Sequence, residues 1–203
     1  MSEKQWYRVL LEDYCTMEVD DDGQQNNILC RIERASPITE WERSWKLARL
    51  PGLGPENVSF LFKLMHDILP TQERVARTKP RASPACPVLG CGDEVENRAH
   101  VLVLCEGNNG VGQRVMRCLE NFFPQIDVDA ALRLEIDVEE DLELPLVWLM
   151  ATVFLAIWKL RVDKSRVQLY EVRAQLEAKV NLLRETRYTQ SASIIDQLVD
   201  NYF

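Results

Sequence analysis

Three cysteines and a histidine in the middle of the chain limit what it can fold into more than any other feature. They are Cys86, Cys91, His100 and Cys105, spaced Cys-(x4)-Cys-(x8)-His-(x4)-Cys. Zinc binds four ligands in a tetrahedron, and thiolate sulfurs and imidazole nitrogens are its usual donors. Because protein atoms would fill all four positions, this spacing predicts a closed, structural Zn2+ site with no open position to activate water.

The cluster has two other interpretations. Its members could be small buried hydrophobic residues and a core histidine, but three of the six cysteines and one of the two histidines fall within 20 residues. A disulfide is disfavoured because no apolar signal segment opens the chain, so the cysteines are expected to be reduced. We expect Cys15, Cys30 and Cys118 to be packing or surface thiols, and His66 to be a structural residue on an apolar helix.

The hydrophobic pattern predicts a mainly α protein. Hydrophobic residues make up 46% of the chain and charged residues 28%, as in folded proteins. Apolar residues recur at helical spacing over several segments: 39–48, 55–69, 96–105, 115–123, 146–163 and 167–187. We expect a small helical domain with a zinc-stapled loop, followed by a C-terminal helical hairpin.

One predicted helix carries an apolar stripe along a single face. Its members are Leu169, Val172, Leu176, Val180 and Leu183. A stripe of this kind is typical of a core-facing helix or of a seam with a partner helix. The 169–183 face is therefore either part of the core or a surface for a protein partner or a second copy of the chain.

Charge divides the chain into four expected regions. These are an N-terminal acidic segment (1–36), a helical zinc-binding domain (37–124), an acidic linker (125–145) and a C-terminal helical region (146–203). Of the net charge of −8, most lies in residues 126–145, which hold eight acidic residues and one basic residue. Apolar and charged residues alternate there, which is typical of a strand, but the same stretch could equally start a helix. The net charge disfavours a nucleic-acid partner.

Other sequence features bear on location and activity. The longest apolar run, 144–158, has 15 residues, fewer than the roughly 20 that span a bilayer. We therefore expect no membrane association and an intracellular protein, in the nucleus or the cytoplasm. The chain contains no glycine-rich nucleotide-binding loop and no Gly-x-Ser-x-Gly motif, so we expect no catalysis.

The cysteines and the histidine belong to a longer ordered set of residues. The set runs Trp41, Trp45, Phe60-Leu61-Phe62-Lys63-Leu64, Leu69-Pro70-Thr71, Arg74, Arg77, Cys86-Pro87, Cys91, Glu96, His100 and Cys105. It covers roughly a third of the chain and resembles the zinc-binding domain that follows reverse transcriptase in non-LTR (LINE-type) retrotransposons. The four-residue gap between Cys86 and Cys91 departs from the two or three more usual there. Residues 155–161, 176–179 and 183–188 are also similar to the C-terminal end of such polyproteins in animals.

The resemblance implies a non-catalytic accessory domain of a reverse transcriptase polyprotein. Such domains assist RNA or DNA binding during target-primed reverse transcription. The polymerase of that family carries a Tyr-x-Asp-Asp motif, and this chain has none. The alternative is a zinc-stabilised, helical protein-interaction module that does not bind nucleic acid and that can self-associate.

Two groups of basic residues are candidates for phosphate contacts. The first lies just before the zinc loop and comprises Arg74, Arg77, Lys79 and Arg81. The second lies at the end of the apolar helix and comprises Lys159, Arg161, Lys164 and Arg166. Both could equally be solvated faces, and charges at a helix C-terminus also complement the helix dipole. We predict nucleic-acid contacts for the first group.

Overall fold

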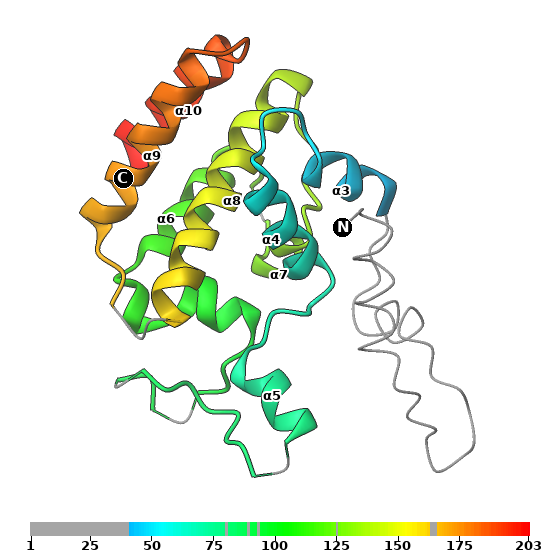
Figure 1. The fold of residues 1–203 in the computed structure, drawn as a ribbon, viewed down its shortest axis with the longest axis vertical. Helices are drawn as coiled ribbons and strands as arrows, with labels where there is room; N and C mark the ends of the chain where they lie inside the picture. Colours follow the sequence, from blue (N-terminus) through cyan, green and yellow to red (C-terminus); the bar gives the residue numbers. More distant parts are fainter. Residues whose placement is uncertain (1–40, 80, 89, 93, 125, 163–165) are drawn as a thin grey trace. The chain divides into compact units, whose positions relative to one another are not determined.

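Helix α8 (Glu140–Val162) forms the centre of the fold (Figure 1). Every residue from Leu144 to Ile157 is buried, so this helix is apolar on all sides and needs neighbours around its circumference. Those neighbours are α3 (Trp41–Ala48), α4 (Pro55–Met65), α6 (Val111–Glu120), α9 (Leu169–Arg184) and α10 (Thr189–Tyr202). The hydrophobic core therefore lies along α8.

The structure is a computed structural model, and it describes residues 41–79, 81–88, 90–92, 94–124, 126–162 and 166–203. Within these residues there is no β-strand, only an isolated antiparallel bridge between Ala85 and Val95. The predicted mainly α fold is thereby confirmed. The expected N-terminal acidic segment, 1–36, lies outside the described residues, together with Cys15 and Cys30.

Helix α8 is longer than its apolar sequence indicates. It spans 23 residues and begins six residues before the predicted start at 146. Glu140, Asp141 and Glu143 lie in its first turn, where acidic side chains interact favourably with the helix dipole. By length and composition alone the helix could cross a membrane, so the expectation that this segment is too short is wrong. However, 83% of its most apolar window is buried inside the protein, as in a core helix.

Helix α9, which corresponds to the predicted helical segment 167–187, forms a hairpin with α10. The two helices pack on each other and both contact α8. Two ion pairs join their exposed sides: Arg173–Asp200 at 2.9 Å and Arg184–Asp196. The apolar stripe of α9 faces inward, with Val172, Leu176, Val180 and Leu183 buried. These side chains pack in the interface of α9 with α8 and α10.

Residues 126–145, within the expected acidic linker, contribute apolar side chains to the main hydrophobic core. Asp127 caps the short helix α7 (Val128–Leu132) by accepting a hydrogen bond from the Ala130 N–H at 2.7 Å. Leu134, which follows α7, is fully buried and has a left-handed φ of 58°. That backbone conformation is incompatible with a continuous strand, so the helical alternative is right for this part.

Basic residues of α3 balance part of the negative charge of this stretch. Arg43 forms an ion pair of 2.7 Å with Asp137. Lys46 lies 3.4 Å from Glu143, whose side chain is 7% exposed. The charge of the acidic stretch is therefore partly neutralised within the fold.

Candidate metal centre

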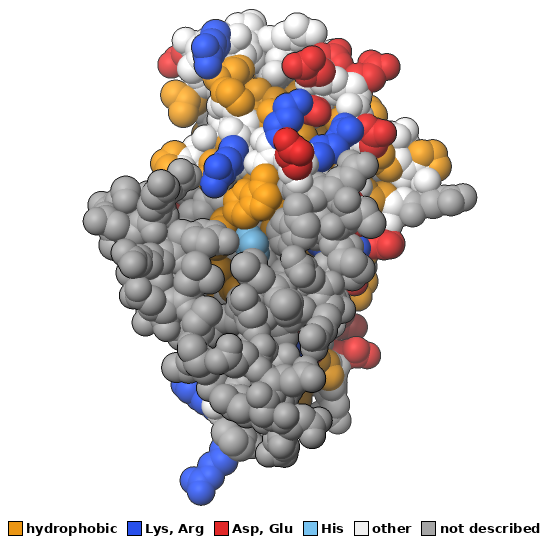
Figure 2. Space-filling model, turned by 90° about the vertical axis from the view of Figure 1, so that its right-hand side faces the viewer, with side chains coloured by type: hydrophobic (Ala, Val, Ile, Leu, Met, Phe, Trp, Pro, Cys, Tyr) orange, Lys and Arg blue, Asp and Glu red, His pale blue; other side chains and the backbone are white. Residues whose placement is uncertain are grey.

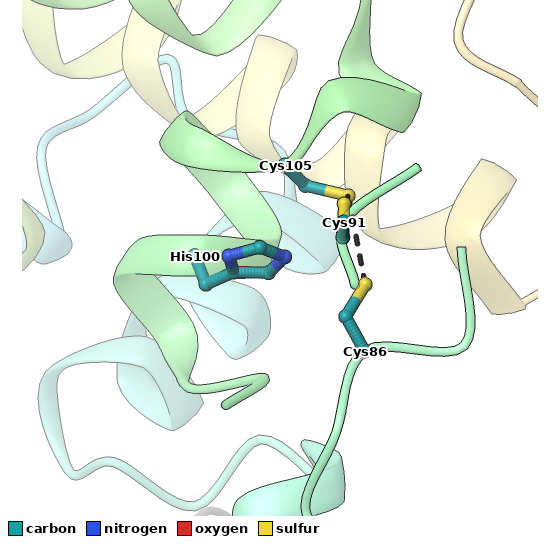
Figure 3. Close-up of side chains that lie close together, drawn as sticks. All are labelled: Cys86, Cys91, His100 and Cys105. Atoms are coloured by element: carbon teal, nitrogen blue, oxygen red, sulfur yellow. Dashed lines mark hydrogen bonds between the residues drawn. The ribbon is translucent and has the colours of Figure 1, made fainter. Parts of the chain in front are cut away.

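The three cysteines and the histidine predicted from their spacing converge on one point (Figure 3). Each offers one donor atom, and the four donor atoms all lie within 4.8 Å of one another. Cys86 and Cys91 come from one loop, while His100 and Cys105 flank the short turn η1 (His100–Leu104). All four residues are buried. The group can therefore hold one metal ion.

The sulfur–sulfur distances fit metal coordination and do not fit a disulfide. The Sγ atom of Cys105 lies 3.6 Å from that of Cys91 and 3.8 Å from that of Cys86. A disulfide bond would require about 2.05 Å. Two sulfurs bound to one zinc ion at about 2.3 Å in tetrahedral geometry lie about 3.8 Å apart. The thiols are free, as predicted, and they are spaced like the edges of a tetrahedral site.

The loop between the first two cysteines turns sharply enough to bring both sulfurs together. Gly90 and Gly92 have φ values of 109° and 62°, in a region that residues with a Cβ rarely adopt. The N–H of Cys86 donates to the carbonyl of Glu94 at 2.8 Å and closes the loop. The four-residue gap between Cys86 and Cys91 is thus accommodated by a hairpin with two left-handed glycines.

Turn η1 is π-helical, and this determines how the histidine meets the last cysteine. The N–H of Cys105 donates at 2.7 Å to the carbonyl of His100, five residues earlier. An α-helix rotates about 100° per residue, so side chains five apart would point about 140° apart. A π-helical turn contains more residues than an α-helical one, so the side chains of His100 and Cys105 point in more similar directions. The His100 ring faces the sulfurs as a result (Figure 3).

Two asparagines support the π turn, and neither was among the residues predicted to belong to the site. The Oδ1 atom of Asn97 accepts the His100 N–H at 2.8 Å, as a helix cap does. Because the Cys105 N–H bonds to His100, the carbonyl of Val101 has lost its ordinary α-helical partner. The Nδ2 atom of the buried Asn108 donates to that carbonyl at 2.8 Å. Asparagine at a capping position is a recognisable signal, whereas the role of Asn108 depends on a π turn that no sequence rule predicts.

Burial determines the chemistry of the donor atoms. The Nε2 atom of His100 is buried without a hydrogen-bond partner among the described residues, and the ring edge that carries it faces the sulfurs. Burial also raises the pKa of the Cys86 thiol, and it raises the pKa of Cys105 to about 12. These thiols would ionise at neutral pH only beside a positive charge, and a metal-bound thiol is deprotonated outright. A divalent cation would therefore satisfy the imidazole and the sulfurs together.

The centre has almost no hydrophobic core of its own. Its cysteines form a small buried cluster with Val88 alone, separate from the main core. Ordering each residue of the surrounding loop costs about 1–2 kcal/mol of conformational entropy. A cluster of this size offsets little of that cost, and a metal ion bound by the four side chains would cross-link the loop.

Helix α5 (Gln72–Thr78) precedes the metal loop and carries the first basic group. The Thr71 side chain caps the start of this helix by accepting the Arg74 N–H at 3.4 Å. Arg74 is half-buried, and its guanidinium donates to the carbonyl of Asp67. This residue therefore takes part in the local fold.

The other three residues of the first basic group are exposed. They are Arg77, Lys79 and Arg81. Arg77 also forms an ion pair of 2.5 Å with Glu73, one turn earlier on α5. Lys79 and Arg81 are the members whose side chains show no hydrogen bond or ion pair with the described residues, although the Lys79 backbone is bonded to Val75 and Ala82.

The second basic group is largely used by the fold. Lys159 pairs with Glu56 at 2.5 Å, and Arg161 pairs with the buried Glu96. Lys164 lies outside the described residues. In the upper part of the face drawn in Figure 2, the described lysine and arginine side chains lie among aspartates and glutamates, whereas the basic side chains at its lower end have no described acidic side chain beside them.

The remaining described cysteine and histidine lie apart from the centre, as the sequence predicts. Cys118 is fully buried in α6, and burial raises its pKa to about 12. The His66 ring packs against Trp45 and Phe62, with centroid distances of 5.2 and 4.5 Å. Burial lowers the pKa of His66 to about 4, so this residue is a neutral packing group at pH 7.

Comparison of the chain with known protein families, with curated proteins and with solved structures gave no match. The likeness to the retrotransposon zinc-binding domain therefore rests on the motif residues of the sequence alone.

Proposed function

We propose that the chain is a non-catalytic zinc-binding accessory domain, derived from the reverse transcriptase polyprotein of a non-LTR retrotransposon. In this role it assists RNA or DNA binding during target-primed reverse transcription. The observation that carries the proposal is the convergence of Cys86, Cys91, His100 and Cys105 on one point. Three sulfurs and one imidazole nitrogen are a donor set of structural zinc. With four protein ligands, the ion has no position left for a substrate or an activated water.

The nucleic-acid contacts are proposed for the exposed basic residues next to the metal loop. Arg77 lies in the last turn of α5. Lys79 and Arg81 follow the helix, before Cys86. Lysine and arginine contacts to phosphate give affinity without sequence readout, and such binding weakens steeply with salt. The net charge of −8 repels nucleic acid at long range. At moderate salt concentration, dissolved ions screen this repulsion, so that it acts only over roughly 10 Å.

The Lys79→Ala/Arg81→Ala protein tests this surface. Both side chains are exposed, so the fold should be unchanged. We expect its affinity for a structured RNA or a DNA duplex to fall at least about tenfold at low salt. The slope of log affinity against log salt should become shallower by about 2, since each lost phosphate contact removes about one unit. The measurement is a fluorescence anisotropy titration of the zinc-loaded protein at several salt concentrations.

The matched control is Arg117→Ala/Arg187→Ala, which removes the same charge from two exposed positions outside this surface. It should retain most of the affinity of the unmodified protein. Equal losses in both variants, or no salt-sensitive binding in the unmodified protein, would contradict the nucleic-acid role. In that case the zinc-stabilised protein-interaction module is the better description, although its predicted surface, the 169–183 face, is covered by the core.

A further inference from the structure

We propose that Glu96 couples metal binding to the docking of α5, so that the basic residues of α5 are held in place only when the metal centre is formed. The proposal rests on the proposed zinc centre and adds regulation to the proposed nucleic-acid surface. Its basis is the position of one buried carboxylate, which contacts α5 and α8 and belongs to the metal loop. Glu96 is fully buried, and it lies between Cys91 and His100 in the sequence.

Glu96 joins α5 to the metal loop through two hydrogen bonds. Its carboxylate accepts the N–H of Gln72 at 2.9 Å, and its backbone carbonyl accepts the N–H of Glu73 at 3.2 Å. Both donors lie in the first turn of α5, where backbone N–H groups have no partner inside the helix. Glu96 thus satisfies backbone groups that α5 cannot satisfy by itself.

Glu96 also joins the metal loop to the central helix. Its carboxylate accepts hydrogen bonds from the guanidinium of Arg161 on α8, with the Nε contact at 3.2 Å. The Arg161 side chain is 16% exposed and lies 5.4 Å from the centroid of the Trp158 ring. A buried carboxylate that loses such a partner is strongly destabilised. The position of Glu96 is therefore tied to the α8 core.

Helix α5 is held against the protein without a buried residue of its own. Its start is fixed by the two hydrogen bonds to Glu96, by the chain connection through the buried Thr71, and by the guanidinium of Arg74, which donates to the Asp67 carbonyl. A helix of seven residues is unstable alone in water. Docking of α5 therefore depends on where Glu96 is held.

The metal centre in turn holds Glu96. The residue lies on a loop segment whose backbone is paired with the segment that carries Cys86, and its N–H donates to the Pro84 carbonyl at 2.9 Å. That loop has almost no hydrophobic support besides the metal centre. Loss of the metal would release the loop and with it the acceptors for the first turn of α5. Because linkage is reciprocal, weakening the Glu96 contacts must also weaken metal binding.

The test compares Glu96→Gln with Glu94→Gln, which removes the same charge from an exposed position in the same loop. Glutamine keeps the size of the side chain and can still accept a hydrogen bond, so the variant should fold; a thermal unfolding curve of the zinc-loaded protein checks this. Two quantities are measured: amide hydrogen exchange in α5, and zinc affinity by competition with a chromophoric chelator.

In the unmodified protein, removal of zinc should increase exchange at the α5 amides, while amides of α8 remain protected. In zinc-loaded Glu96→Gln, exchange in α5 should increase and zinc affinity should fall by about 5- to 100-fold, as for a typical coupling between sites. Glu94→Gln should change neither. The proposal is overturned if α5 stays protected without zinc, or if Glu96→Gln leaves both quantities unchanged.

Neither measurement contains nucleic acid. Failure of the coupling is therefore distinguishable from failure of the proposed function, which the salt-dependent titration tests separately. A protein that binds no zinc at all would overturn both proposals.

Discussion

The Cys105→Ser protein is expected to lose its metal ion and at least about 3 kcal/mol of its free energy of unfolding. Metal-binding free energy at a structural zinc site contributes directly to folding. Cys105 is chosen because its Sγ atom lies 3.8 Å from that of Cys86 and 3.6 Å from that of Cys91. In a domain of this size the loss should lower the midpoint of thermal unfolding by roughly 10 °C. Differential scanning calorimetry with zinc in slight excess measures the change.

The matched control is Cys118→Ala, at a buried cysteine in α6. It removes a thiol from the main core and should cost about 1–2 kcal/mol for the lost packing. Its zinc content should be unchanged, because Cys118 is not among the four converging residues. If Cys105→Ser is no less stable than Cys118→Ala, then the cross-linking role of the metal is wrong.

The second large effect is expected for Gly112→Ala in α6. A Cβ atom at this position would lie 2.8 Å from both the carbonyl carbon of Leu102 and the Cα of Val103. These are backbone atoms of η1, so no side-chain rotation can relieve the clash. Alanine favours a helix over glycine by about 1 kcal/mol, but overpacking against a backbone costs more. We expect a net loss of about 2 kcal/mol, measured by urea unfolding.

This substitution should also weaken metal binding, because it pushes α6 away from the turn that orients His100. Gly54→Ala is the control: a Cβ there meets nothing within 4 Å and φ is −66°. Its effect on stability should stay below about 1 kcal/mol, and its metal affinity should be unchanged. Equal effects of the two substitutions would show that the close approach of α6 to η1 is unimportant.

The metal-binding residues are the part of the site that sequence predicts best. Metal ligands are few and chemically specific, and zinc tolerates a range of loop lengths between them. The spacing of Cys86, Cys91, His100 and Cys105 was therefore sufficient to predict their convergence. The geometry that achieves it was not predictable, because the π turn depends on tertiary partners such as Asn108 and Gly112.

The periodicity of apolar residues predicts that helices are present in these segments. It does not predict where each helix begins, or which of its side chains are buried or paired. Helix α8 starts at Glu140, in a stretch whose alternating charges are equally typical of a strand. The apolar stripe on α9 fits a core face and a partner seam alike, and only the position of its neighbours decides between them. In the same way, Arg161 and Lys159 form a basic pair in sequence, yet both are paired with carboxylates from distant segments.

The metal content of the purified protein shows directly whether Cys86, Cys91, His100 and Cys105 bind zinc. Native mass spectrometry of protein expressed with zinc in the medium gives the number of ions per chain. We predict one zinc ion per chain, and none in the separate variants Cys86→Ser, Cys91→Ser, His100→Ala and Cys105→Ser. A purified protein without zinc, or variants that all retain zinc, would contradict the proposed zinc site.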